Sequence, residues 1–241
     1  VCANRQRANK MVDAINKIKA GFARDAIQIG MWLNMRSTTV AEIAAGAGYD
    51  WCLIDGEHGP FDFEAIQGQL QAIAGRGAAP VVRIPAAESW MVKQVLDLGA
   101  QTILVPMVNS GDEAAAMVRA VRYPPNGMRG VASDVARASD YGANVDYVAT
   151  ADAQTCLIVQ AESRAALENI DAIANTDGVD CVFIGPSDLS ADMGFAPDSV
   201  QVRDAIEHMI ARIRAAGKAV GIITFDPEKM THYSRLGVRF I

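Results

Sequence analysis

Two acidic residues and a histidine follow an apolar run in the segment LIDGEHGP, residues 53–60. The run WCLI has the composition of a buried strand, and Asp55, Glu57 and His58 stand where it ends. Histidine changes its charge near neutral pH and can move a proton when a carboxylate supports it. His58 is therefore a candidate general acid and base, and a structural histidine is the alternative.

Three further apolar runs end in residues that could bind an anion or a metal ion. Arg83 closes APVV, Glu162 follows CLIVQA, and Asp188 follows FIGPS. Asp55 and Arg83 are 28 residues apart, and Glu162 and Asp188 are 26 apart, which is about one strand–helix unit in each case. This spacing predicts that the four side chains share one rim of a parallel sheet.

Each candidate also has a structural interpretation. Glu162 and Asp188 on neighbouring strands would supply hard oxygen ligands to Mg²⁺ or Mn²⁺, or they are solvated loop acids. Arg83 at the end of a buried run needs an anion, which is either a substrate or a structural partner such as Asp55 or Glu57.

The segment GPSDLS adds a candidate anion site. A turn at Gly185 and Pro186 lets the backbone N–H groups of Ser187 and Asp188 open a short helix, where a substrate carboxylate would bind. Trp32, at the end of the first apolar run, either lines the same pocket or belongs to the core.

The elements that must hold these residues alternate between short apolar runs and helical patterns. The runs are apolar throughout and do not alternate between apolar and polar residues, which is typical of parallel strands buried on both faces. Strands are predicted at 27–33, 51–55, 79–84, 101–106, 155–162, 180–185, 219–225 and 238–241. Helices are predicted at 38–47, 62–75, 88–98, 110–122, 163–175, 200–216 and 227–236.

Eight such strands in a chain of 241 residues are typical of an α/β fold, the (β/α)₈ or TIM barrel. A doubly wound sheet is the rival, but its glycine-rich phosphate turn is missing, since the first strand ends in WLNMRS. We expect one barrel domain over residues 1–241, with an N-terminal helix within residues 1–24. Because the chain stops at Ile241, where the eighth strand ends, the eighth helix is expected to be missing.

Composition limits the class of protein. The net charge is −6, and the basic segment NRQRANK is short and interrupted, so we expect no nucleic-acid partner. No apolar stretch approaches the roughly 20 residues that cross a bilayer. A signal peptide is also absent, so a cytoplasmic protein without a membrane partner is expected. The four cysteines form no CxxC pair and are interpreted as reduced structural thiols.

From about Ile29 to Ile241 the chain resembles the HpcH/HpaI aldolase family. These are metal-dependent (class II) pyruvate aldolases related to 2-keto-3-deoxy-sugar-acid aldolases and macrophomate synthase. The resemblance lies in the ordered set GMWLNMRS, WCLIDGEHGP, PVVRIP, TILVPMV, RYPPNGMRG, VQAES and FIGPSDLSADMG. It implies a barrel of the phosphoenolpyruvate/pyruvate type, a cytoplasmic carbon–carbon lyase of the kind found in aromatic compound catabolism, and a hexamer built as a trimer of dimers.

The resemblance also implies roles for individual residues. Glu162 and Asp188 match the family's metal ligands, for Mg²⁺ or Mn²⁺, with Co²⁺ and Zn²⁺ as alternatives. Arg83 matches the arginine that steadies the enolate oxygen. His58 matches the catalytic histidine, and Asp55 matches the acid near it.

Three further positions match residues that bind substrate. Gln160 matches a glutamine of the pyruvate site, and Ser187 with Asp188 supplies amides for the pyruvate carboxylate. Asp97 matches an acid that reaches a neighbouring subunit's site. The chain departs from the family pattern at Ala161 and Ala132, which touch no catalytic position, and in lacking a final helix that packs on a partner.

The expected reaction cleaves or forms 4-hydroxy-2-oxo acids and gives pyruvate and an aldehyde. Pyruvate would chelate the metal ion, which with Arg83 would stabilise the enolate, while His58 moves the proton of the aldol hydroxyl. No lysine falls at these strand ends to form a Schiff base. A lyase acting on acyl-CoA thioesters, an oxaloacetate decarboxylase and a non-catalytic barrel are the alternatives.

Overall fold

The computed structural model describes residues 15–60 and 62–241. The predicted helix within residues 1–24 lies partly outside this range, and the described part of it is α1 (Lys17–Ala23). Seven parallel strands follow one another in sheet order: β1 (Gly30–Leu33), β2 (Trp51–Asp55), β3 (Ala79–Arg83), β4 (Thr102–Val105), β5 (Cys156–Ala161), β6 (Cys181–Ile184) and β7 (Ala219–Ile222).

The sheet is curved into a ring, and the last residues of the chain close it. Phe240 bridges Gln28, just before β1, and Gly221 in β7, in parallel fashion in both cases. The Gln28 N–H donates to the Arg239 carbonyl at 2.8 Å, and the Ile222 N–H donates to the Phe240 carbonyl at 2.9 Å. The predicted eighth strand at 238–241 therefore stands in its place, with bridges instead of a full ladder, and the predicted barrel fold is confirmed.

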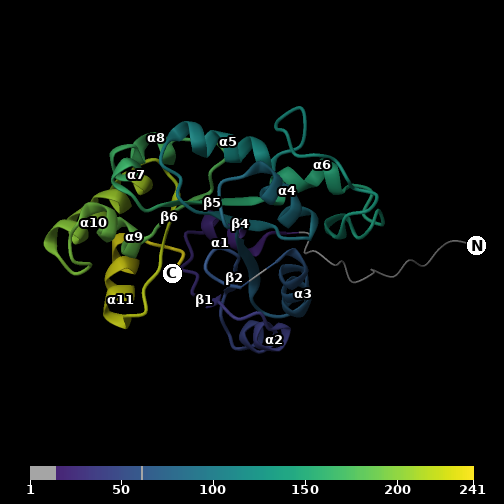
Figure 1. Cartoon of the computed structure of the whole chain (residues 1–241), viewed down its shortest axis with the longest axis horizontal. Helices are drawn as coiled ribbons and strands as arrows, with labels where there is room; N and C mark the ends of the chain where they lie inside the picture. Colours follow the sequence, from purple (N-terminus) through teal and green to yellow (C-terminus); the bar gives the residue numbers. More distant parts are fainter. Residues whose placement is uncertain (1–14, 61) are drawn as a thin grey trace, which may run out of the picture.

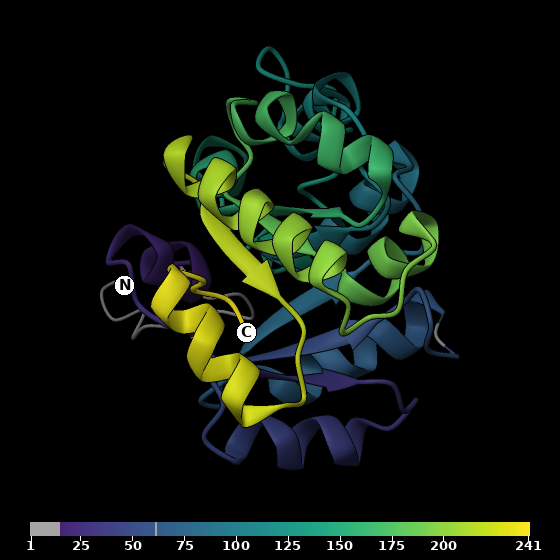
Figure 2. The same cartoon turned by 90° about the vertical axis from the view of Figure 1, so that its left-hand side faces the viewer.

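Helices surround the ring on its outer side (Figure 1). Their bounds are α2 (Thr38–Gly46), α3 (Phe63–Ile73), α4 (Ser89–Asp97), α5 (Gly111–Val121), α6 (Tyr147–Gln154), α7 (Arg164–Glu168), α8 (Ile170–Ala174), α9 (Pro186–Met193), α10 (Val200–Ala215) and α11 (Pro227–Leu236). Figure 2 shows α10 and α11 on the outer side of β7. The predicted helix 163–175 is two helices that meet at Asn169, and α6 was not predicted.

Buried apolar side chains lie both outside and inside the ring of strands. Alternate residues of each strand point outward against the helices, and the others fill the barrel interior. The interior set comprises Ile18, Trp51, Leu53, Ala79, Val81, Leu104, Cys156, Ile158, Cys181, Phe183 and Phe240. Burial on both faces explains why the strand sequences are continuously apolar.

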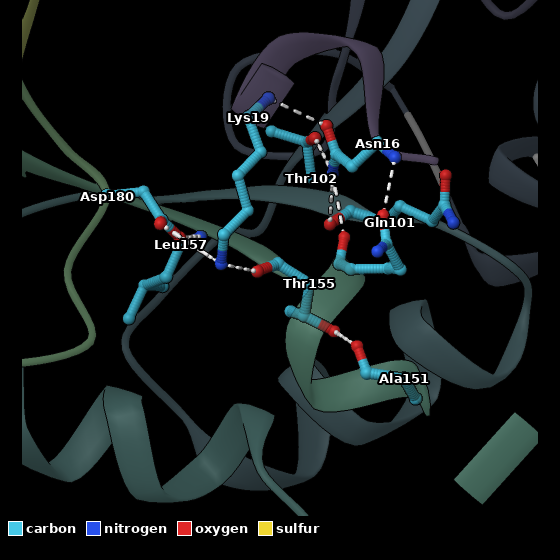
Figure 3. Close-up of polar contacts among 9 residues, drawn as sticks. Asn16, Lys19, Gln101, Thr102, Ala151, Thr155, Leu157 and Asp180 are labelled. Carbon is cyan, nitrogen blue, oxygen red and sulfur yellow. Dashed lines mark hydrogen bonds and ion pairs between the residues drawn. The ribbon is translucent and has the colours of Figure 1, made fainter. Parts of the chain in front are cut away.

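The N-terminal ends of the strands are covered by the start of α1 (Figure 3). The Asn16 side chain caps α1 by accepting from the Lys19 N–H at 3.0 Å, and it donates to Thr102 Oγ1 at 2.9 Å. Lys19 Nζ reaches the Thr155 carbonyl at 3.0 Å and Asp180 at 3.1 Å. These contacts join α1 to the chain at the starts of β4, β5 and β6, so the carboxyl ends of the strands form the open end.

Candidate active site

A pocket of about 420 Å³ opens at the carboxyl ends of the strands. This is the end at which barrel enzymes place their functional residues. The lining residues are Trp32, Asn34, Asp55, His58, Arg83, Gln160, Phe183, Gly185, Pro186, Ser187, Asp188, Ile223 and Phe225. Seven of the predicted site residues are thus brought together. Glu162 is not a lining residue but contacts Gln160, and Asp97 lies elsewhere.

Arg83 and Asp55 form a buried, two-bond ion pair on neighbouring strands. Their Cα atoms are partners in the β2–β3 ladder, and Arg83 Nε and Nη2 lie 2.8 and 2.7 Å from Asp55 Oδ1 and Oδ2. Asn34 adds a third donor, 2.6 Å from Oδ2. Burial alone would raise the pKa of Asp55, but the hydrogen bonds and charge of Arg83 hold it below its ordinary value.

The sequence analysis considered a structural ion pair with Asp55 as one explanation for Arg83, and the structure contains it. The guanidinium nevertheless lines the pocket. A guanidinium has five N–H donors, of which two hydrogen-bond Asp55, while Nη1 also forms an ion pair with Glu57. Arg83 also lies over the Trp32 ring, 4.6 Å from its centroid. Asp55 and Trp32 therefore fix the plane of the guanidinium, and two N–H groups are left for a ligand.

The expected support of His58 by Asp55 takes a different form in the structure. Asp55 Oδ1 accepts from the backbone N–H groups of Glu57 and His58 at 3.2 and 3.3 Å, so it shapes the turn and does not contact the imidazole. Both of its oxygens are already occupied by Arg83 and Asn34. The His58 side chain is 66% exposed, which leaves it free to meet a substrate at the pocket mouth.

Glu57 is the carboxylate nearest to the imidazole. Its Oε2 lies 3.9 Å from His58 Nε2 and 2.7 Å from Arg83 Nη1, without good hydrogen-bond geometry to any described donor. Burial raises the pKa of Glu57, and the charges of Asp55 and Asp188 reinforce the shift against the opposing effect of Arg83 and His58. Sequence analysis considered Glu57 only as a structural partner of Arg83, which this contact with Nη1 confirms, and did not predict that it lies near the imidazole.

Glu162 is a buried carboxylate at the end of β5, only 2% exposed. Its Oε1 accepts from the Met107 N–H at 2.9 Å, and its Oε2 accepts from Gln160 Nε2. Burial raises the pKa of Glu162, these two hydrogen bonds lower it, and the negative charges of Asp188 and Glu57 raise it further. Met107 presents its N–H from a left-handed backbone, with φ of 54°. Sequence patterns gave no signal for Met107.

The loop between β6 and α9 lies directly against Glu162. A Cβ atom at Gly185 would stand 2.4 Å from Glu162 Oε2 and 2.8 Å from its Cβ, so only glycine fits there. α9 begins at Pro186 and has no side-chain cap, which leaves the N–H groups of Ser187 and Asp188 directed outward from a helix start. A carboxylate ligand suits this position.

The donor set fits a hard divalent cation better than a tightly caged metal. The described residues contain no group of three or more histidine, cysteine, aspartate or glutamate side chains arranged to hold an ion. Mg²⁺ and Mn²⁺ are commonly held by one or two carboxylates, with water and substrate oxygens completing the shell. Glu162, buried among the negative charges of Asp188 and Glu57, matches that pattern.

The remaining pocket wall is apolar. Trp32 lies 5.9 Å from Phe183, ring to ring, inside the barrel, and Ile223 and Phe225 follow β7 at the mouth. Phe225 is 89% exposed. Asn34, Phe183, Ile223 and Phe225 were not predicted as site residues, because the first follows a short strand and the others resemble ordinary core positions.

Asp97 does not line this pocket. It lies at the end of α4 and forms an ion pair with Arg129 at 2.8 Å, whose guanidinium is buried over the Tyr123 ring. Asp97 lines a separate pocket of about 250 Å³ with Arg137 and Tyr141. Its predicted contact with a neighbouring subunit's site stays a prediction.

No helix in residues 15–60 or 62–241 combines the length and apolar character that a membrane crossing requires.

Comparison with known proteins gives one consistent result. The family described as HpcH/HpaI aldolase/citrate lyase matches residues 28–241. A solved structure of a protein of that family from Burkholderia cenocepacia superposes with a TM-score of 0.91 and 41% identity, over 94% of this chain and 91% of the other.

Two similar sequences have named activities. A hydroxypyruvate/pyruvate aldolase of Agrobacterium fabrum is 50% identical over 228 residues, which is 94% of this chain and 86% of the relative. A 2-keto-3-deoxy-L-rhamnonate aldolase of Klebsiella pneumoniae is 49% identical over 228 residues, which is 94% of this chain and 85% of the relative.

Proposed function

We propose a reaction and a set of residue roles for this chain, which belongs to the HpcH/HpaI aldolase/citrate lyase family and is an aldolase. It cleaves and forms 4-hydroxy-2-oxo acids, with pyruvate as the 2-oxo acid product and an aldehyde as the second product. The observation that carries this proposal is the buried Arg83, held in plane by Asp55 in the wall of a pocket that Gln160 and Asp188 also line.

A divalent cation, Mg²⁺ or Mn²⁺, completes the proposed site and is held by Glu162 and Asp188. When bound, it supplies Lewis-acid stabilisation of the negative charge that develops on the substrate oxygens. Support for it comes from the position of Glu162, which is 2% exposed and lies near the negative charges of Asp188 and Glu57.

Arg83 stabilises the same charge by hydrogen bonding. As the C3–C4 bond of the substrate breaks, its electron pair moves toward C2 and negative charge develops on the 2-oxo oxygen. The two remaining guanidinium N–H groups of Arg83 donate to that oxygen. Because the contacts with Asp55 and Trp32 already hold the guanidinium in place, little reorganisation is needed during the reaction.

The substrate carboxylate is bound by the backbone N–H groups of Ser187 and Asp188 at the start of α9. These amide N–H groups do not ionise near neutral pH, so they orient the 2-oxo acid without taking part in proton transfer.

His58 accepts the proton of the C4 hydroxyl during cleavage and returns it to the aldehyde oxygen during synthesis. Neutral imidazole can accept this proton, and Glu57, whose Oε2 lies 3.9 Å from Nε2, stabilises the imidazolium that results. The released enolate takes a proton from water at C3 and becomes pyruvate, and His58 gives the proton of the C4 hydroxyl back to solvent, so no net proton is gained or lost.

A homo-oligomer, specifically a hexamer arranged as a trimer of dimers, is also part of the proposal. Exposed apolar side chains of the segment 128–145, including Met128, Val131, Val135 and Val145, support a contact there. Under this assembly Asp97 lies at the interface.

The test is a retro-aldol assay that follows pyruvate release from a 4-hydroxy-2-oxo acid. Enzyme stripped with EDTA should be inactive and should recover with Mn²⁺ or Mg²⁺, and Glu162→Gln should not recover. Pyruvate release at the full rate without metal would overturn the metal site, and no release by the wild-type protein from any 4-hydroxy-2-oxo acid tried would overturn the reaction.

A further inference from the structure

Arg83 has one guanidinium nitrogen that Asp55 does not contact, and Glu57 lies against it. Asp55 takes the side of the guanidinium that carries Nε and Nη2, at 2.8 and 2.7 Å. Nη1 is left, and Glu57 Oε2 forms an ion pair with it at 2.7 Å. In the proposed function, the N–H groups that Asp55 leaves open donate to the 2-oxo oxygen of the substrate. The carboxylate of Glu57 therefore contacts a nitrogen that the substrate oxygen needs.

The contact between Glu57 and Arg83 is held by charge and not by a well-formed hydrogen bond. Oε2 of Glu57 is buried, and no donor in the described part of the chain meets it with hydrogen-bond geometry. The same oxygen lies 3.9 Å from His58 Nε2, so a movement of about 1 Å toward the imidazole would bring it within hydrogen-bond distance. Glu57 can therefore exchange one cationic partner for the other without leaving the site.

The charges around Glu57 do not balance without a second cation. Two carboxylates, Asp55 and Glu57, share the single guanidinium of Arg83, which leaves one negative charge in excess. Asp188 adds negative charge nearby, and the Glu57 side chain is only 17% exposed. A poorly solvated carboxylate needs a counter-charge. If an anionic substrate takes Arg83, protonated His58 is the other positive group that acts on Glu57 among the described residues.

We propose that Glu57 is a positioning residue that competes with the substrate for Arg83 and moves to His58 when the substrate binds. This inference rests on the proposed function. In the free site, the carboxylate of Glu57 neutralises the Nη1 side of Arg83. The 2-oxo oxygen displaces it as negative charge develops there, and the displaced carboxylate then stabilises the proton on His58. The same movement releases the arginine to the substrate and gives the imidazole its counter-charge.

A neutral side chain at position 57 should change ligand binding and catalysis in opposite directions. Glu57→Gln keeps the size of the side chain but removes the charge that competes for Arg83 and supports His58. Oxalate is a planar dianion that carries a charged oxygen where the enolate oxygen develops. We expect Mn²⁺-loaded Glu57→Gln to bind oxalate about tenfold more tightly than wild type. The kcat of retro-aldol cleavage should fall about tenfold, whereas loss of a merely structural residue would weaken both.

The decisive measurement is the affinity for oxalate relative to that for pyruvate, by calorimetry at saturating Mn²⁺. The 2-oxo oxygen of pyruvate is uncharged, so its affinity should rise less than that of oxalate when the competing carboxylate is removed. A weaker metal site would affect both ligands and largely cancels in the ratio. The ratio should rise in Glu57→Gln, with kcat and thermal unfolding measured on the same samples. A wild-type ratio would overturn the proposal, even if kcat falls.

Glu64 offers a matched control. It lies in the first turn of α3, is exposed, and lines a separate pocket with Arg36 and Gln69. Glu64→Gln makes the same change of net charge away from the catalytic pocket and should leave both the ratio and kcat at their wild-type values. A ratio that rises equally in Glu64→Gln would assign the effect to net charge and refute the competition for Arg83.

Glu57→Asp tests the contact without changing the net charge, and it replaces Glu57→Gln if that variant does not fold. Its carboxylate is withdrawn by one methylene group from Nη1 of Arg83, so the ratio of oxalate to pyruvate affinity should rise by about threefold. A wild-type ratio in this variant would also contradict the competition. If Mn²⁺-loaded wild-type protein bound neither oxalate nor pyruvate, the proposed function itself would fail, which is a different outcome from an unchanged ratio.

Discussion

Arg83→Lys tests whether the planar guanidinium, and not its charge alone, is needed for the reaction. Arg83 contacts Asp55 through two hydrogen bonds of 2.8 and 2.7 Å and lies 4.6 Å from the Trp32 ring centroid. Lysine keeps the charge but can replace only one arm of this fork. Loss of one charge-assisted hydrogen bond and part of the ring contact corresponds to about 2–4 kcal/mol.

If the lost interactions stabilise the transition state but not the free enzyme and substrate, kcat/KM should decrease by about 30- to 1000-fold. The assay is retro-aldol cleavage, with Mn²⁺ affinity and thermal unfolding measured on the same samples. Arg212→Lys is the matched control, because Arg212 forms an equivalent fork with Asp171, at 2.6 Å for both bonds, on the exposed surface. Wild-type kcat/KM in Arg83→Lys, within about threefold, would refute the role of the guanidinium.

His58→Ala should slow aldol cleavage by about 100-fold or more while Mn²⁺ affinity, measured by calorimetry, stays unchanged; a wild-type cleavage rate would make His58 structural. The pKa of Asp55 is lower in the folded protein, so its ionised form stabilises the fold above about pH 4 and this stabilisation is lost below it. Urea unfolding from about pH 6 to 3 should therefore show a steeper loss of stability for wild type than for Asp55→Asn, and parallel curves would contradict this. Gly185→Ala should weaken Mn²⁺ binding about tenfold by displacing Glu162, whereas Gly46→Ala should not, because the added carbon at the end of α2 would meet no described atom within 4 Å apart from its chain neighbours and the backbone of its own helix. Equal affinities of the two alanine variants would refute the steric argument.

The sequence was sufficient to predict the barrel and most of the pocket. Strand ends are identifiable because apolar runs stop abruptly, and a barrel brings those ends to one rim. Residues 51–55 were predicted as a strand and form β2 with the same bounds. Asp55, Arg83, Gln160 and Asp188 accordingly line one pocket.

The contacts between these residues could not be predicted, because they depend on register and side-chain orientation. The β2–β3 register places Asp55 opposite Arg83, which commits its carboxylate to that partner and leaves Glu57 nearest to the His58 ring. Met107 donates to Glu162 from an unusual backbone conformation that no local pattern signals. The helical pattern over residues 163–175 is continuous in the sequence, so the break between α7 and α8 at Asn169 could not be predicted either.

If this pocket forms the enolate of pyruvate with the help of a divalent metal ion, the methyl protons of pyruvate should exchange with solvent. Pyruvate in D₂O is followed by NMR with protein treated with EDTA, and again after Mg²⁺ or Mn²⁺ is added. We expect loss of the methyl proton signal only when protein and metal are both present, much slower loss with Arg83→Lys, and no loss with Glu162→Gln. Exchange at the same rate without metal, or no exchange by metal-loaded wild-type protein, would contradict it.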